Sequence, residues 1–342
     1  MRRIEISGRV IDERSPAFII AEAADSHLGS MENAKEMILQ AKRAGADCIK
    51  FQHHLPDEEM LPEIPMSDNF EEPLYEFLKK NALTLKQHKE LKDYCEKTGI
   101  IYLCTPFSYK AALELDSIEV DAFKIGSGEF TDFTSLRKIV GIGKPMILST
   151  GMSTLEEVRQ TYDLLKTLKT DFAFMNCVSE YPPIYEDMNI RFIDTLMREC
   201  PDIVIGHSDH TPDLYTSFAA VAIGAKIIEK HVTLDKSRPG PDRAVSIDMN
   251  GLAQLVDGVH KIELSLGSER KVHDREKQIR EWAFRSVVTT RDIEAGTVLT
   301  EDMLWTKRPG TGIPSRELPA IIGKIAKLSL KANTLLRRED VE

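Results

Sequence analysis

The stretch Ile203-Val-Ile-Gly-His-Ser-Asp-His210 is a short β-branched run that ends in histidine, and Lys226-Ile-Ile-Glu-Lys-His231 repeats this pattern one helix-length later. Continuous apolar runs are typical of parallel strands, because helices cover both faces of such a sheet. If the two runs are neighbouring strands, His210 and His231 leave the sheet at the same end. The two imidazoles would then converge on one point.

Earlier apolar runs of the same kind alternate with segments of helical periodicity. They lie at Ala17–Ala21, Asp47–Phe51, Ile100–Cys104, Ala122–Ile125, Pro145–Leu148 and Asp171–Met175. Capping boxes, Thr84 with Gln87 and Ser153 with Glu156, indicate two of the helix starts. Eight strand–helix units over roughly 265 residues match a (β/α)8 TIM barrel in number and length. A doubly wound α/β sheet fits less well, because no GxGxxG motif follows a strand.

The sequence divides into a large and a small predicted domain. We assign the barrel to residues 1–267 and a charged linker to 268–282. Residues 283–342 contain short strand and turn signals, such as Ser286–Thr289. A domain of about 60 residues buries little core by itself, so we expect it to pack on a barrel, either its own or a partner's.

Composition limits the classes of partner. Of the 342 residues, 42% are hydrophobic and 29% are charged, which is ordinary for a globular protein. The net charge of -10 argues against general nucleic-acid binding. The five cysteines include no CxxC pair, which indicates reduced thiols and a cytoplasmic location. No apolar run reaches about 18 residues, so we expect neither a signal peptide nor a membrane span.

Polar side chains stand where the predicted strands end, which is where TIM barrels carry their catalytic residues. They are Glu22, Lys50, Gln52, Thr105, Lys124, Ser127, Ser149, Ser179, His210, Glu229 and His231. Two histidines with open coordination positions suit a Lewis-acid metal that also holds substrate and water. The alternative is that one histidine lies in the core and the other in a loop.

Lys50 and Lys124 lie inside apolar runs, where an unpaired lysine is costly. They could form buried ion pairs with Glu22 or Glu229, capture an anion, or form a Schiff base. The Lys124-Ile-Gly-Ser-Gly128 stretch offers the close backbone approach and the hydroxyl that phosphate binding uses. Burial would raise the pKa of Glu22, which suits acid–base chemistry or a salt bridge. For Cys177 no activating partner is apparent, and we expect it to pack in the core.

Taken together, these motifs resemble the sialic acid synthase family, which condenses phosphoenolpyruvate with an N-acyl hexosamine. The matching stretches are Ile20-Ala-Glu22, His27-Leu-Gly-Ser30, Ile49-Lys-Phe-Gln52, Cys104-Thr-Pro-Phe107, Phe123-Lys-Ile-Gly-Ser-Gly-Glu129, Ile147-Leu-Ser-Thr-Gly-Met152, Tyr181-Pro182, Gly206-His-Ser-Asp-His-Thr211, Glu229-Lys-His231 and Arg238-Pro-Gly-Pro-Asp242. The segment from Ala283, with Lys307-Arg-Pro-Gly310, resembles the antifreeze-like (SAF, β-clip) domain that closes these synthases.

The resemblance implies a TIM barrel followed by an antifreeze-like domain, in a domain-swapped homodimer. It implies Mn2+, with Mg2+ or Co2+ as alternatives, on His210 and His231. The residues it implies for phosphoenolpyruvate are Lys50, Thr105, Lys124, Ser127, Ser149 and Ser179. Those it implies for the amino sugar are Gln52, Asn69, Tyr181, Asp242 and, from the partner's tail domain, Arg308. Catalytic roles fall to Glu22, Lys50, Lys124 and Tyr181.

Three hypotheses about function remain at this stage. The first is this synthase, with N-acetylmannosamine as the favoured sugar. A 2,4-diacetamido-trideoxyhexose, giving a legionaminic- or pseudaminic-type acid, is the alternative substrate. The chain departs from the family's usual pattern at Ala24-Asp25-Ser26 and at Ser179, and these departures bear on the choice of sugar. The second hypothesis is a Schiff-base aldolase, and the third is a non-enzymatic sugar- or ice-binding protein.

Overall fold

The computed structural model describes residues 2–65, 72–237 and 240–342. The chain forms two compact units, Met1–Leu266 and Gly267–Glu342, which are described separately below. None of the helices in the described ranges has the length and apolar character that a bilayer-spanning segment requires.

The first unit is a closed barrel of eight parallel strands, in the order β10-β3-β4-β5-β6-β7-β8-β9. Its strands are β3 (Phe18–Glu22), β4 (Cys48–His53), β5 (Ile101–Pro106), β6 (Phe123–Ile125), β7 (Met146–Ser149), β8 (Phe172–Cys177), β9 (Val204–Asp209) and β10 (Ile227–His231). The closed barrel confirms the predicted fold class and excludes the doubly wound sheet. Each of the predicted runs became a strand. Most of these strands continue one or more residues beyond the apolar run, into the polar segment.

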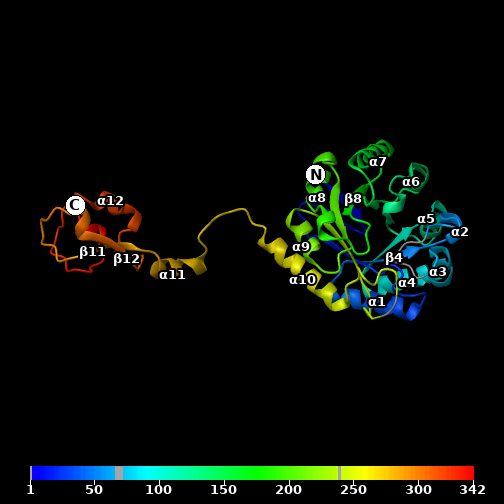
Figure 1. The fold of residues 1–342 in the computed structure, drawn as a ribbon, viewed down its shortest axis with the longest axis horizontal. Coiled ribbons are helices and arrows are strands. Elements are labelled where there is room, and N and C mark those ends of the chain that lie inside the picture. The colour runs from blue at the N-terminus through cyan, green and yellow to red at the C-terminus, as the bar shows by residue number, and fades with distance from the viewer. Residues whose placement is uncertain (1, 66–71, 238–239) are drawn as a thin grey trace. The chain divides into compact units, whose positions relative to one another are not determined.

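Helices surround the barrel, as Figure 1 shows for this unit. They are α1 (Met31–Ala44), α2 (Pro56–Glu59), α3 (Leu74–Asn81), α4 (Leu85–Thr98), α5 (Tyr109–Ser117), α6 (Phe133–Val140), α7 (Leu155–Leu168), α8 (Phe192–Glu199), α9 (Tyr215–Ala222) and α10 (Met249–Ser265). The predicted capping box of α4 is present at Thr84 and Gln87. The box of α7 is formed by Thr154 and Glu157, so the prediction for that helix was one residue too early.

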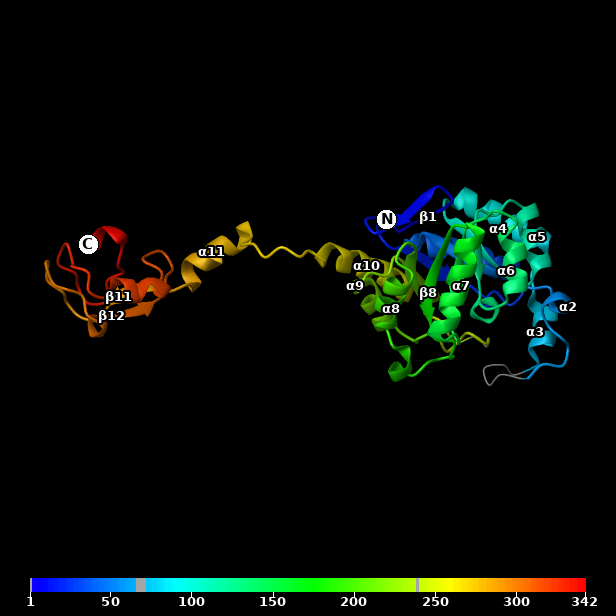
Figure 2. The same cartoon turned by 90° about the horizontal axis from the view of Figure 1, so that it is seen from above.

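A hairpin that the sequence did not predict closes the N-terminal end of the barrel. Strands β1 (Arg3–Ile6) and β2 (Arg9–Asp12) pair antiparallel, and Figure 2 shows them beside the barrel. The apolar side chains of this hairpin pack in one buried cluster with residues that begin the barrel strands, such as Phe18. The barrel interior at this end is therefore filled with apolar side chains.

The second unit has a small apolar core of its own, which includes Val287, Leu299 and Leu336. Strand β11 (Ser286–Thr289) pairs antiparallel with β12 (Leu304–Lys307), and α12 spans Leu318–Ile321. Helix α11 (Asp274–Ala283) occupies most of the segment that was predicted as a linker. A capping box at His273 and Glu276 marks the start of this helix. Many of its residues are charged, and none of them is buried.

Candidate active site

A cavity of about 360 Å³ lies at the C-terminal ends of the barrel strands. This size is in the range of small-molecule sites. Every site residue predicted within the described part of the barrel lines it, namely Glu22, Lys50, Gln52, Thr105, Lys124, Ser127, Ser149, Ser179, Tyr181, His210, His231 and Asp242. The strands that supply these residues are far apart in the sequence but adjacent in the barrel.

Two lysines and two carboxylates form a buried network on the floor of the cavity. Lys50 Nζ lies 2.9 Å from Glu229 Oε2 and 3.4 Å from Glu22 Oε2. Lys124 Nζ lies 3.5 Å from Glu229 Oε1 and donates to Ser149 Oγ at 2.6 Å. The ion pairs considered from the sequence are therefore present. They hold both ammonium groups at the cavity wall, where an incoming anion could also reach them.

The pKa values of the two carboxyl groups in this network are shifted in opposite directions. Burial alone would raise the pKa of Glu229, but Lys124 and Lys50 outweigh it and keep this pKa well below its usual value. Burial raises the pKa of Glu22 to about 7, although Lys50 opposes the shift. Burial also lowers the pKa of Lys124. Glu229 is thus the permanent counter-charge, while Glu22 titrates near neutral pH and can exchange a proton.

Hydroxyl groups surround the lysines. Within the described ranges, Thr105 Oγ1 is buried and has no hydrogen-bond partner. Ser127 begins a short 3-10 turn (Ser127–Glu129), and its Oγ accepts a hydrogen bond from the Gly151 backbone N–H at 3.1 Å. A Cβ at Gly151 would come within 2.2 Å of Ser179 Oγ and 2.6 Å of Ser127 Oγ. Glycine is therefore required where these two hydroxyls approach the backbone.

His210 and His231 come together as predicted, with ring centroids 5.1 Å apart. Each side chain is only 5% exposed. Among the described residues neither Nδ1 atom has a hydrogen-bond partner, and Asp242 Oδ2 lies 3.6 Å from His231 Nδ1. Burial keeps the pKa of His231 well below its usual value, so this imidazole is neutral and has a free lone pair. Two unpaired imidazole nitrogens beside a carboxylate fit a divalent cation.

The remaining ligands of such a cation are not arranged in advance. Within the described ranges, no group of three or more His, Cys, Asp or Glu side chains is placed to hold a metal ion. Water, substrate or a small movement of Asp242 would have to complete the coordination.

The surroundings of Cys177 differ from the prediction, which gave its thiol no activating partner. Its Sγ lies 4.0 Å from His210 Nε2, so the thiol has a partner that was not apparent from the sequence. Burial would raise the pKa of Cys177, but His210 outweighs it and lowers this pKa. The contact joins residues on β8 and just after β9, and only the barrel register brings these together.

Further acidic, polar and apolar residues line the cavity beside this network. Gln52 Nε2 donates to Glu22 Oε1 at 2.8 Å, and His54 Nε2 lies 3.0 Å from Gln52 Oε1. Burial raises the pKa of both Asp242 and Glu129 to about 7. Sequence reasoning gave no role to several lining residues here, namely Asp25, His54, Leu74, Leu78, Phe107 and Glu129. His54 could have been found from strand alternation, since it follows Gln52 by two positions.

Two further barrel histidines, His53 and His207, do not line this cavity. His53 pairs with Glu114 at 2.8 Å, and His207 Nδ1 lies 3.0 Å from the Asn176 carbonyl. Two further predicted residues cannot be placed in this cavity. Asn69 lies outside the described residues. Arg308 belongs to the second unit, where it donates to the Ala283 carbonyl at 3.1 Å and lies over the Trp282 ring.

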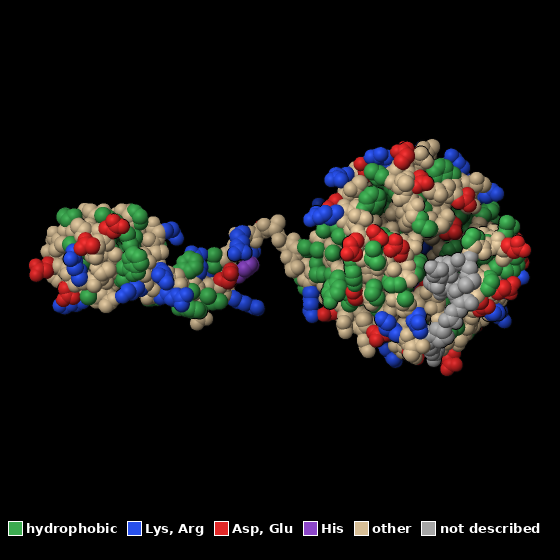
Figure 3. Space-filling view, viewed as in Figure 1, with side chains coloured by type: hydrophobic (Ala, Val, Ile, Leu, Met, Phe, Trp, Pro, Cys, Tyr) green, Lys and Arg blue, Asp and Glu red, His purple; other side chains and the backbone are tan. Residues whose placement is uncertain are grey.

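The outer surface carries charges of both signs. On the face of the barrel unit drawn in Figure 3, basic and acidic side chains are interspersed among the described residues. Nucleic-acid binding typically uses a face on which basic residues are clustered.

The fold and site define a TIM-barrel protein with a polar pocket at the C-terminal ends of its strands, joined to a small β domain. The model of the NeuB family matches residues 37–271, and the model of the SAF domain matches residues 284–342. The chain therefore belongs to the NeuB family, which confirms the predicted resemblance.

Named relatives cover nearly the whole chain. N-acetylneuraminate-9-phosphate synthase of Mus musculus is 35% identical over 98% of this chain and 95% of its own length. N,N'-diacetyllegionaminic acid synthase of Legionella pneumophila is 36% identical over 95% of this chain and 94% of its own. The solved structure of N-acetylneuraminic acid synthetase from Leptospira borgpetersenii is 32% identical, with a TM-score of 0.72, over 81% of this chain and 95% of that one.

Proposed function

We propose that this protein condenses phosphoenolpyruvate with an N-acyl hexosamine, giving a nonulosonic acid and phosphate. The observation that carries the proposal is the convergence of Lys50, Lys124 and the hydroxyls around them on one cavity that also contains His210 and His231. The names of the relatives support the same reaction class.

Lys50 and Lys124 would hold the two anionic groups of phosphoenolpyruvate. The hydroxyl of Thr105, which has no partner among the described residues, would bind one of them, together with Ser127, Ser149 and Ser179. Such donors are already in place before substrate arrives, so they stabilise charge without reorganisation. Because Glu229 already balances part of the lysine charge, a dianion would compete with it for the ammonium groups.

His210 and His231 would hold a divalent cation, Mn2+ in this proposal and Mg2+ or Co2+ as alternatives. Once bound, it supplies Lewis-acid polarisation of a carbonyl oxygen. Tyr181 packs against His210 with ring centroids 4.5 Å apart, and it would limit where the aldehyde carbon of the open-chain sugar can lie. Asp242 would accept hydrogen bonds from the sugar hydroxyls.

Three bonds between heavy atoms then change. The methylene carbon of phosphoenolpyruvate forms a C–C bond with the aldehyde carbon, whose oxygen takes up a proton and becomes a hydroxyl, and C2 of phosphoenolpyruvate becomes electron-deficient. Water adds at C2, and phosphate leaves with cleavage of the C–O bond. Glu22, whose pKa is raised to about 7, is placed beside Lys50 to stabilise this cationic centre and to take the proton from water.

The acidic residues of the cavity favour an uncharged sugar. Asp25, Glu129 and Asp242 line the same cavity as the lysines, and in their charged forms they would repel a sugar phosphate. N-acetylmannosamine is therefore our first substrate, and a 2,4-diacetamido-trideoxyhexose, giving a legionaminic- or pseudaminic-type acid, is the alternative. The apolar wall of Leu74, Leu78 and Phe107 would suit the methyl group that the alternative carries.

The test is phosphate release from phosphoenolpyruvate in the presence of Mn2+ and each of a panel of amino sugars. We expect release with N-acetylmannosamine or the diacetamido sugar and at least tenfold less with N-acetylmannosamine 6-phosphate. If no sugar releases phosphate from the folded protein, the proposal is wrong.

A Schiff-base aldolase is the second candidate, because burial lowers the pKa of Lys124 and so favours its nucleophilic form. Borohydride reduction in the presence of pyruvate separates the two mechanisms. The synthase proposal expects no covalent adduct by mass spectrometry, whereas the aldolase would be trapped on Lys124 or Lys50.

We further propose a domain-swapped homodimer in which Arg308 of the partner subunit binds the sugar. The support is the family resemblance of the tail and the exposure of Arg308 within its own unit. Mixing Lys124→Met subunits with Arg308→Ala subunits tests this, since mixed dimers would restore one intact site. No recovery of activity in verified mixed dimers would contradict the swap.

A further inference from the structure

Strands β9 and β10 carry ionisable side chains on both of their faces. Residues that line the cavity alternate with Asp209 and Lys230, which point to the opposite side of the sheet. Asp209 and Lys230 are direct cross-strand neighbours, and both side chains are 0% exposed. Carrying two charges into a fully buried position is costly unless both are fully hydrogen-bonded.

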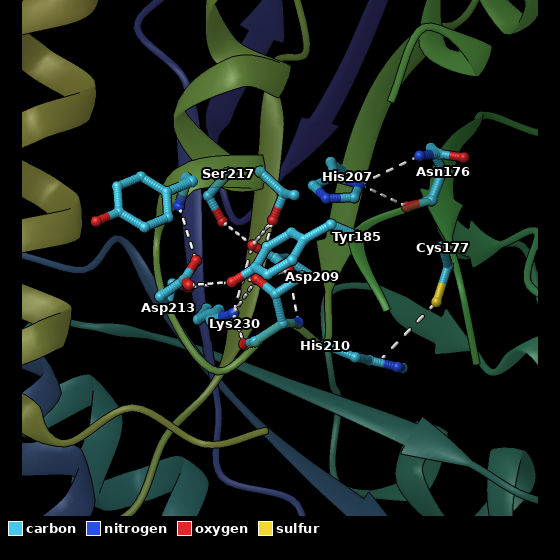
Figure 4. A network of polar contacts seen from close by, with 12 residues as sticks. Asn176, Cys177, Tyr185, His207, Asp209, His210, Asp213, Ser217 and Lys230 are labelled. Carbon is cyan, nitrogen blue, oxygen red and sulfur yellow. Dashed lines mark hydrogen bonds and ion pairs between the residues drawn. The ribbon is translucent and has the colours of Figure 1, made fainter. Parts of the chain in front are cut away.

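The Asp209 carboxylate is saturated with donors, as Figure 4 shows. Its Oδ1 accepts from the Thr211 backbone N–H at 2.8 Å. Its Oδ2 accepts from Thr216 Oγ1 at 2.8 Å and from Ser217 Oγ at 2.6 Å, and it lies 3.3 Å from Lys230 Nζ. The carboxylate therefore ties the end of β9 to the start of α9 and to β10.

Lys230 completes the connection from the neighbouring strand. Its Nζ donates to the Thr211 backbone carbonyl. Thr211, which follows His210, is thus held at its N–H by Asp209 and at its carbonyl by Lys230. Lys230 itself immediately precedes His231. The ion pair therefore fixes the backbone on both sides of His210 and links it to the backbone that carries His231.

The two imidazoles have much weaker restraints on the cavity side. Within the described ranges both Nδ1 atoms lack a hydrogen-bond partner, and His210 Nε2 has only the 4.0 Å contact with Cys177. In Figure 4 His210 points toward Cys177 and away from Asp209. Packing of Tyr181 on His210 and the approach of Asp242 to His231 Nδ1 are the other restraints, so the backbone behind the rings has a large share in setting their relative position.

We propose that the buried Asp209–Lys230 pair is a positioning element that sets the relative placement of His210 and His231, and through it their affinity for a divalent cation. This inference rests on the proposed function, because it takes these two histidines as the metal ligands. Outer residues that orient metal ligands commonly change metal affinity by about 10- to 100-fold when they are replaced.

The test is Mn2+ affinity of the full-length chain, measured by electron paramagnetic resonance of the free ion, for Asp209→Asn, Lys230→Met and the double variant. Each single change should weaken binding about 10- to 100-fold. The double variant should lose no more Mn2+ affinity than the single variant that binds Mn2+ more weakly, because both residues act through one connection. Melting temperatures of the metal-free proteins show whether each variant is folded.

A matched control lies near the other end of β10. Lys226 Nζ pairs with Glu263 Oε1 at 3.2 Å, away from the cavity. Lys226→Met with Glu263→Gln should lower stability without changing Mn2+ affinity by more than twofold. Folded Asp209→Asn and Lys230→Met proteins that bind Mn2+ like the unaltered chain, or a control that weakens equally, would overturn the positioning role.

A second readout covers variants that fold poorly and separates this inference from the metal assignment. Ser217→Ala removes a single donor to Asp209 and should shift the imidazole NMR signals of His210 and His231 in the metal-free protein, with a several-fold loss of Mn2+ affinity. Unmoved signals would contradict the inference. If the unaltered chain binds no Mn2+, or His210→Ala binds it equally well, the metal assignment fails, and the NMR signals alone decide the positioning role.

Discussion

The two ends of the barrel are built from the same eight strands but differ in their chemistry. At the N-terminal end, Ile4, Ile6 and Ile11 of the hairpin are at most 1% exposed and pack on apolar side chains of the strands. At the C-terminal end the buried side chains are ionisable or polar. Several of their atoms have no hydrogen-bond partner within the described ranges, including Thr105 Oγ1 and His210 Nδ1.

This difference separates stability from function along one set of strands. Burying apolar atoms stabilises the fold, whereas a buried polar atom without a partner costs about 1–3 kcal/mol. Such atoms are expected where a ligand supplies the missing partner. Substitutions at the two ends should therefore have opposite profiles, with losses of activity at one end and losses of stability at the other.

The largest expected effect follows replacement of His210 or His231 by alanine. Loss of Lewis-acid assistance, worth several kcal/mol, should lower kcat by about 10³-fold or more. EDTA treatment of the unaltered protein should do the same, and Mn2+ should restore turnover. Phosphate release measures both. Full activity in metal-free protein would remove these histidines from the mechanism.

Lys124→Met should come next, with kcat/KM reduced on the order of 10²-fold, because a preorganised charge near the anion is lost. Lys144→Met is the matched control. Lys144 pairs with Asp116 at 3.5 Å and lies just before β7, at the opposite end of the barrel. If Lys144→Met lowers kcat/KM as much as Lys124→Met, the claim that catalysis depends on only one end of the barrel is wrong.

Ile11→Ala tests the apolar end. Truncation of a fully buried isoleucine should lower the free energy of unfolding by about 2–5 kcal/mol, measured by urea denaturation. Steady-state kinetics below the melting temperature should give kcat/KM within twofold of the unaltered protein. A large kinetic change would show that the hairpin also shapes the cavity.

Thr105→Val, at the polar end, should weaken substrate binding without lowering stability. Removing a buried hydroxyl that has no partner among the described residues should leave the melting temperature unchanged or raise it. The KM for phosphoenolpyruvate should rise about tenfold, since one hydrogen bond to an anion is lost. A lower melting temperature with unchanged KM would assign Thr105 to packing.

The smallest effect is a pH dependence of stability at Glu129. Its pKa rises from 4.5 to about 7 on folding because of burial, so the carboxyl costs stability as pH rises through this window. The melting-temperature difference between Glu129→Gln and the unaltered protein should therefore shift in favour of the variant from pH 5 to 7.5.

Asp12 in the hairpin is the control for that trend. Backbone hydrogen bonds from Arg14 and Ser15 lower the pKa of Asp12, so its contribution is present above 3.8 and is lost only in acid. The difference between Asp12→Asn and the unaltered protein should stay flat from pH 5 to 7.5. If the melting-temperature difference for Glu129→Gln is equally independent of pH, burial does not raise the pKa of the Glu129 carboxyl.

The barrel was predictable because its strands are continuous apolar runs, and the polar residues at their ends could be found by position alone. The hairpin at Arg3–Asp12 was missed because each of its strands has only four residues, although Ile4 and Ile6 alternate with Arg3 and Glu5 before the Ser7-Gly8 turn. The Cys177–His210 contact depends on the register of β8 against β9, which no local pattern gives. In β9 and β10 the strand pairing continues through the polar residues up to Asp209 and His231, close to the ends of the two runs that decide the fold.

The most direct test of the central claim is the fate of oxygen from water during turnover. The protein would be incubated with phosphoenolpyruvate, Mn2+ and its best amino sugar in 18O-labelled water, and both products analysed by mass spectrometry. C–O cleavage at the polar end of the barrel predicts label in the sugar acid and unlabelled phosphate. Label in the phosphate would contradict the proposed reaction.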